Sequence, residues 1–142
     1  MIVNLHWGTE YRHAPDPFQK ALARRLGRSH AVTAVVGQHA HVVQPIRRLN
    51  GRWVVFGSGN LLSNQSAACC AAATQDGMVV TLHLQVRGGR ARVEKVRYAP
   101  TYVRHPDMRV LARRVDGLAG GVFGYAPGRH ALRPVVAGAL NR

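Results

Sequence analysis

The feature that most restricts the fold is a strand–helix–strand pattern near the start of the chain. The apolar run IVNLHW predicts a strand that ends at Trp7. A helix is predicted next, because Asp16 can cap its N-terminus, Pro17 suits its first turn and Gly27 can end it. The run AVTAVVG predicts a second strand. Such a unit favours parallel strands joined by a right-handed crossover, so the sequence predicts an α/β domain.

Two antiparallel hairpins are predicted after this unit. HVVQPIRRL and RWVVFGSG flank Asn50-Gly51, and GMVVTLHLQVR and RARVEKVRY flank Gly88-Gly89. Both dipeptides suit tight turns between strands. The apolar residues expected to alternate on one face of the second hairpin are Met78, Val80, Leu82, Leu84 and Val86. The predicted architecture is therefore parallel strands with one crossover helix, followed by antiparallel hairpins.

Two helices are predicted, the crossover helix with an apolar face and a later helix with a capping residue. In the crossover helix, Phe18, Leu22 and Leu26 are spaced to share one buried face. A later helix, DMRVLARRVDGL, is predicted with Asp107 as its cap. The segment after it has no pattern that favours a particular structure.

Composition narrows the class of protein. A chain of 142 residues has the length of one domain, and it has no apolar run of membrane-spanning length and no visible signal peptide, so as written it is expected to be cytoplasmic. The net charge of +14 comes almost entirely from arginines scattered along the chain. Cys69 and Cys70 are adjacent, a spacing that strains a disulfide and does not suit a metal site, so we interpret them as small apolar residues.

Three histidines are the candidate functional residues of this chain. His6 ends the first predicted strand, and His39 and His41 follow the second. Ligands of α/β sheets gather at the carboxyl ends of strands, and imidazoles at such ends can bind a metal. The alternative is that the pair His39 and His41 simply forms hydrogen bonds with backbone or water.

Four stretches in this order resemble a known family: NLHWGTEY, AVVGQHAHVVQP, WVVFGSGNLLS and TQDGMVVTLHL. They resemble the C-terminal half of the CapA-type capsule or poly-gamma-glutamate biosynthesis proteins, which belong to the calcineurin-like metallophosphatase superfamily. The resemblance implies that residues 1–104 form the C-terminal half of such a domain, with a partial metallophosphatase-like sheet. Residues 105–142 are then a C-terminal extension, one helix followed by irregular structure.

The resemblance also implies roles for individual residues. It makes His6, His39 and His41 metal ligands, and His6 and Glu10 the candidate catalytic residues. The implied cofactor is a divalent metal, Mn, Zn or Fe. This chain departs from the family at Gln38, where a histidine is common, and at Ala40, where a proline is common. Gly59 and Asn60, in the stretch FGSGN, are interpreted first as turn formers.

The implied metal site is incomplete in this chain. The superfamily holds two metals with an aspartate-rich first half that the sequence does not contain, and the chain has only six acidic residues. We therefore expect a truncated protein that acts as a metal-dependent phosphatase-like hydrolase only if the N-terminal half is supplied. The implied partners are an anionic polymer or phosphoryl substrate and capsule machinery at the membrane, because the family is typically membrane-associated or exported.

Two other classes of function remain open. A small basic nucleic-acid-binding protein would explain the net charge, although the basic residues are not clustered and aromatic residues make up only 6% of the chain, so no specific nucleic acid is expected as a partner. A catalytically inactive interaction module that has kept the sheet is the other alternative.

Overall fold

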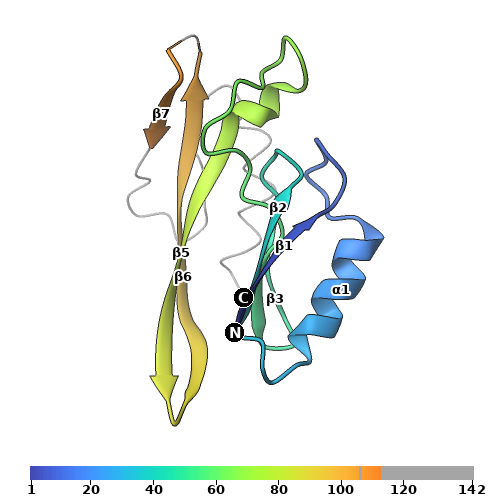
Figure 1. Ribbon diagram of the computed structural model, residues 1–142, viewed down its shortest axis with the longest axis vertical. Coiled ribbons are helices and arrows are strands. Elements are labelled where there is room, and N and C mark those ends of the chain that lie inside the picture. Colours follow the sequence, from blue (N-terminus) through green and yellow to red (C-terminus); the bar gives the residue numbers. More distant parts are fainter. Residues whose placement is uncertain (106, 113–142) are drawn as a thin grey trace.

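The computed structural model describes residues 1–105 and 107–112, which form two sheets and one α-helix (Figure 1). The elements in chain order are β1 (Ile2–Trp7), α1 (Pro17–Gly27), β2 (Ala34–His39), β3 (Ile46–Leu49), β4 (Arg52–Val55), the 3-10 helix η1 (Ala72–Gln75), β5 (Asp76–Arg87), β6 (Arg90–Arg104) and β7 (Arg109–Ala112). Within these residues we find no helix with the length and apolar character needed to cross a membrane.

The first sheet is mixed and has the strand order β1-β2-β4-β3. β1 runs parallel to β2 and β2 runs parallel to β4, whereas β3 pairs antiparallel with β4. Asn50 and Gly51 join β3 to β4 with positive φ angles of 49° and 79°, as a tight two-residue hairpin turn requires. The predicted α/β class, the crossover helix and this hairpin are confirmed.

The second sheet has the order β5-β6-β7 and consists mainly of the long hairpin β5–β6, which Gly88 and Gly89 close with φ angles of 54° and 72°. The predicted alternation is confirmed only in part. Met78, Val80 and Leu82 pack in the core. The register of β5 shifts between His83 and Leu84, and beyond it Leu84 and Val86 are exposed. Beyond this β-bulge Gln85, and not Leu84 or Val86, is the half-buried residue of β5.

Helix α1 begins and ends where the sequence predicts. Asp16 accepts a hydrogen bond from Gln19 N, and Gln19 Oε1 accepts one from Asp16 N, which completes a capping box. The predicted buried face is wrong in one position, because Phe18 is 65% exposed. The fully buried row is instead Gln19, Ala23 and Gly27. A Cβ at Gly27 would lie 2.7 Å from Leu49 O, so small residues let the helix approach the sheet closely.

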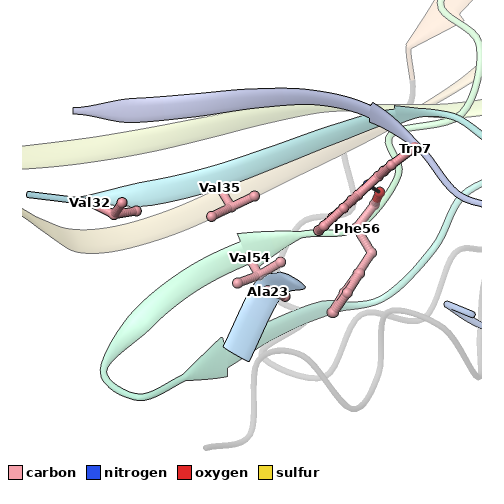
Figure 2. Close-up of a cluster of buried hydrophobic side chains, with 6 residues drawn as sticks. All are labelled: Trp7, Ala23, Val32, Val35, Val54 and Phe56. Carbon is pink, nitrogen blue, oxygen red and sulfur yellow. Dashed lines mark hydrogen bonds between the residues drawn. The ribbon is translucent and has the colours of Figure 1, made fainter. Parts of the chain in front are cut away.

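Helix α1 and the β5–β6 hairpin lie on opposite sides of the first sheet (Figure 1), and each covers an apolar cluster. The cluster under α1 consists of Trp7, Ala23, Val32, Val35, Val54 and Phe56 (Figure 2). The cluster under the β5–β6 hairpin consists of Val43, Ile46, Val55, Met78 and Val96. The protein thus has three layers, helix, mixed sheet and antiparallel ribbon, and the first sheet is covered on both faces as a parallel sheet requires.

Trp7 anchors the cluster under α1. Its ring stacks on Phe56 with centroids 5.6 Å apart, and its Nε1 donates a hydrogen bond to Phe56 O (2.9 Å). A Cβ added at Gly37 would lie 2.1 Å from both Trp7 Nε1 and Phe56 O, so only glycine fits there. Trp7 follows His6 directly, and therefore the same packing that buries the indole fixes the end of β1.

The helix predicted from Asp107 is wrong in the part that the structure describes. Asp107 forms an ion pair with Arg104 instead of capping a helix, and this contact lowers the pKa of its carboxyl group. Arg109–Ala112 form strand β7, which pairs with Thr101–Arg104 of β6. The free edge of β6 offers backbone groups to this segment, and that pairing overrides its helical pattern. The rest of the predicted helix lies outside the described residues.

Candidate functional site

The three singled-out histidines meet at the carboxyl ends of β1 and β2. His6 is level with Gln38 in the parallel register, and His39 is the last residue of β2. The ring centroids of His6 and His39 are 4.2 Å apart, and those of His39 and His41 are 6.2 Å apart. All three line one pocket of about 400 Å³. The predicted convergence is confirmed, while their role as metal ligands stays a prediction.

The backbone around this pocket adopts conformations that residues with side chains rarely take. His39 has a φ of 105°, His41 a φ of 59° and Tyr11 a φ of 62°. Positive φ outside glycine costs of order 1–3 kcal/mol per residue and persists only where the surroundings enforce it. Such strain gathers at functional sites, and here it turns the backbone immediately around two of the histidines.

Hydrogen bonds join the loop after β1 to the segment after β2. Tyr11 N donates to Ala40 O (2.8 Å), and His13 Nδ1 donates to Val43 O (2.7 Å). These contacts hold the segment that carries Glu10 beside the histidine loop. Ala40, where the family commonly has proline, is buried and still supplies the backbone carbonyl for the first of these bonds.

A buried pair of glutamines connects helix α1 to the loops that surround the histidines. Gln19 Nε2 donates to Gln44 Oε1 (2.8 Å), and both side chains are fully buried. Gln44 Nε2 donates in turn to Arg12 O (2.8 Å). Gly8, with a φ of 95°, passes so close that a Cβ there would lie 2.7 Å from the Gln19 amide. The first turn of α1 is thereby connected to the site loops, because buried amides must find partners.

Asn60 is a site residue that the sequence interpretation placed among the turn formers. Its Nδ2 donates to Gln65 Oε1 (3.2 Å) and to Thr74 O (3.0 Å), so its Oδ1 is the atom that faces His41 Nδ1 at 3.0 Å. His41 Nδ1 must therefore carry the proton, which leaves the lone pair of its neutral ring on Nε2. The stretch FGSGN by itself predicts a turn, and the contact between its asparagine and His41 joins residues that are 19 positions apart in the sequence.

Glu10 lies next to the histidine cluster. Its Oε1 is 3.7 Å from His41 Nε2, the atom that Asn60 leaves without a proton in the neutral ring. Tyr11 stacks on His41 with centroids 6.0 Å apart. The pKa of the Tyr11 phenol is raised, first by desolvation and then by the negative charge of Glu10, so the phenol stays neutral. The predicted catalytic residues His6 and Glu10 thus lie at the same end of the sheet.

The donors fit a divalent metal in kind but not in number. Imidazole nitrogens and a carboxylate are ordinary ligands of Zn, Mn and Fe. Within residues 1–105 and 107–112, however, no three His, Cys, Asp or Glu groups are arranged to hold a metal ion together. Asp16, the other acidic residue near this end of the sheet, has its carboxylate engaged in the capping box and by Thr9.

The adjacent cysteines differ from their interpretation as small apolar residues. Both are free and exposed. The pKa of the Cys69 thiol is lowered, first by a hydrogen bond with Cys70 and then by the Ser66 backbone. The pKa of Cys70 is raised, chiefly because the same hydrogen bond holds its proton. Exposure follows from their place in a turn, where no sheet or helix covers them.

We expect Cys69 to be alkylated faster than Cys70 at near-neutral pH. A lowered pKa leaves more thiolate at a given pH, and the thiolate is the nucleophile. The measurement is iodoacetamide labelling at several pH values, with fragment mass spectra to separate the two positions. Cys70→Ala should slow the labelling of Cys69, because it removes the hydrogen-bond donor. Equal rates at both cysteines would contradict the asymmetry.

Comparisons with known proteins agree with the sequence motifs. Residues 1–65 match the family model of the bacterial capsule synthesis protein PGA_cap. The chain is 34% identical over 97 residues to the PGA biosynthesis protein CapA of Bacillus subtilis (strain 168), an alignment that covers 68% of this chain and 24% of that protein. It is 33% identical over 88 residues to the capsule biosynthesis protein CapA of Bacillus anthracis, an alignment that covers 62% of this chain and 20% of that protein. No solved structure matches.

Proposed function

Starting from the relationship of this chain to the CapA-type capsule biosynthesis proteins, which the comparisons confirm, we propose that it takes part in capsule or poly-gamma-glutamate formation. The chain spans about a quarter or less of the length of these relatives. In this proposal it contributes one part of a metal-dependent hydrolase site with a metallophosphatase-like fold. The substrate is an anionic polymer or a phosphoryl compound, handled with the capsule machinery at the membrane.

The observation that carries the proposal is the meeting of three imidazoles at the end of a parallel sheet. His6 and His39 come from adjacent strands, and His41 follows on a strained turn. The strain supports a functional origin, because a loop without a task could relax to ordinary φ angles. The contact of Asn60 with Nδ1 of His41 supports it too, since metal-binding histidines usually have the other nitrogen hydrogen-bonded.

In the proposed site His6, His39 and His41 would each offer an imidazole to a divalent Mn, Zn or Fe ion, and ligands from another segment would be needed to hold it, because these groups alone are not arranged to do so. Such an ion polarises a substrate oxygen and lowers the pKa of bound water. Glu10, 3.7 Å from His41 Nε2, would receive or return a proton at its Oε1. Tyr11 would shield one side of His41 from water with its neutral ring. The segment joined by the Tyr11 and Ala40 backbone bond keeps these groups at one end of the sheet.

The carboxylates that complete the site would come from another segment. Two cations about 3.5–4 Å apart need anionic ligands between them, and Glu10 is the one carboxylate beside the histidines in the described part of the chain. We infer that an aspartate-rich segment of the kind found in the metallophosphatase superfamily supplies them. This chain alone is then expected to bind metal weakly.

Calorimetry tests this proposal. Zinc or manganese should bind weakly to the wild type, and the double substitution His39→Ala with His41→Ala should remove that binding. The matched control is His30→Ala with His83→Ala, which removes two exposed imidazoles away from the site. Control uptake should equal that of the wild type. Equal loss in both variants, or equal uptake by all three proteins, would mean that histidines bind the metal without a site.

A further inference from the structure

A second pocket lies between the two sheets, and four of the eight described residues that line it are arginines. Its volume is about 590 Å³, in the range of ligand-binding pockets. Arg52 enters it from the start of β4, and Arg87, Arg90 and Arg92 enter it from the β5–β6 hairpin. Arg87 and Arg90 are paired across the hairpin next to its turn. One pocket thus collects guanidinium groups from both sheets.

This pocket lacks anionic partners in the part of the chain that the structure describes. No acidic side chain lines it, and none of its arginines forms an ion pair with a described residue. The Nε of Arg52 is buried and makes no hydrogen bond to any described residue. Guanidinium groups crowded without counter-charge repel one another, and a buried donor without a partner destabilises the fold. An anion entering the pocket would relieve both costs.

The arginine pocket and the histidine site occupy opposite ends of the first sheet. Arg52 is the first residue of β4, whereas the histidines follow the carboxyl ends of β1 and β2, which run parallel to β4. The N-terminal amine of Met1 donates to Ala31 O, and Thr33 Oγ1 donates to Ala91 O at 3.3 Å, so these contacts fix the pocket beside the amino end of the sheet. A ligand of both sites would have to be long.

We propose that the arginine pocket binds the anionic polymer through its carboxylates, as an anchoring site separate from the histidine site. This step rests on the proposed function for its choice of polymer. Planar guanidinium groups bind carboxylates through paired, charge-assisted hydrogen bonds. Gln85 Oε1 accepts a hydrogen bond from Arg92 Nε (2.8 Å), which turns its amide N–H groups toward other acceptors, such as the backbone carbonyls of a polyamide.

The other residues that line the arginine pocket favour a polycarboxylate over a nucleic acid as its ligand. Ala31 and Ala91 give small apolar surfaces next to the arginines, and among the described residues His30 provides the single aromatic ring, with no Phe, Tyr or Trp in the lining. Single-stranded nucleic acids are usually held by stacking of bases on aromatic rings. A chain that alternates amide groups with carboxylates offers carbonyl oxygens to the Gln85 amide and carboxylates to the arginines, whereas polyphosphate offers phosphate oxygens alone.

The test measures binding of a fluorescent glutamate oligomer to the full chain without added metal. The variant Arg87→Gln with Arg90→Gln removes two exposed arginines of the pocket, and Arg25→Gln with Arg97→Gln removes two exposed arginines elsewhere, so both variants have the same net charge. The pocket variant should bind at least about tenfold more weakly, since one lost charge-assisted hydrogen bond is worth about 1.5–3 kcal/mol. The control variant should bind within about twofold of the wild type.

Several results would overturn the proposal. Equal weakening in both variants would mean attraction by overall charge. Polyphosphate and single-stranded DNA of equal length are the competing ligands. If either binds as tightly as the glutamate oligomer and loses the same affinity in the pocket variant, the choice of a polycarboxylate is refuted.

The variant His39→Ala with His41→Ala tests whether the two sites are separate. It should keep its binding of the polymer. A failure of the metal-binding test leaves this measurement unaffected, so the two proposals fail separately.

Discussion

Trp7→Ala is expected to lower the free energy of unfolding by about 3–5 kcal/mol, which is a large part of the stability of a small domain. The indole is 4% exposed, stacks on Phe56 and donates to its carbonyl oxygen. Removing it leaves a cavity under α1 and an acceptor without its donor. Urea unfolding followed by circular dichroism measures the loss, and the midpoint should fall or the folded state should disappear.

Two variants control this prediction. Phe18→Ala removes an aromatic ring that is 65% exposed and should change stability by no more than about 0.5 kcal/mol. Trp7→Phe keeps an aromatic ring but cannot donate to Phe56 O, so it should lose clearly less than Trp7→Ala. If Trp7→Ala and Phe18→Ala had the same effect, the cluster under α1 would not hold the fold together.

The second large effect concerns hydrolysis. The purified chain is expected to show no phosphomonoesterase or phosphodiesterase turnover above a metal-only control, because the imidazoles and Glu10 cannot supply the bridging carboxylates of a two-metal site. Joining the chain to the remaining N-terminal segment of a CapA relative, or mixing the two, should create metal-dependent turnover. The assay is release of nitrophenolate from mono- and diester substrates with zinc, manganese or iron present.

The same assembled protein provides the controls. His39→Ala should abolish the new turnover, and His83→Ala, which removes an exposed imidazole on the β5–β6 hairpin, should leave it unchanged. Addition of a chelator should stop the reaction. Robust turnover by the short chain alone that survives the chelator would contradict both the incomplete site and the proposed mechanism.

Much of the fold could be predicted because its signals are local. The cap at Asp16, the stop at Gly27 and the turn at Asn50-Gly51 act within a few residues and are formed as the sequence indicates. The meeting of the three histidines followed from the parallel pairing of β1 with β2. The order of the first sheet, in which β4 lies inside and β3 outside, depends on long-range packing that no local pattern reports.

The parts that were missed are decided by tertiary contacts. Phe18 has the right spacing for burial, but the close approach at Gly27 turns it outward. Gln19 looks like an ordinary surface residue of a helix, and only its contact with Gln44 explains why it is buried. Asn60 could be recognised as an orienting residue only once His41 lay beside it. The segment that begins at Arg109 became a strand because β6 offered it an edge.

The unpaired edge of β1 restricts which kind of strand could pair there and complete the histidine site. Within the described residues β1 pairs only with β2, so its other row of backbone groups can accept one more strand. Two copies of this chain related by a twofold axis would pair their β1 strands antiparallel, which puts the two histidine clusters at opposite ends of the doubled sheet. Self-association through this edge therefore cannot bring the clusters together. A strand of different sequence that runs parallel to β1 would carry the loop after its own carboxyl end to His6.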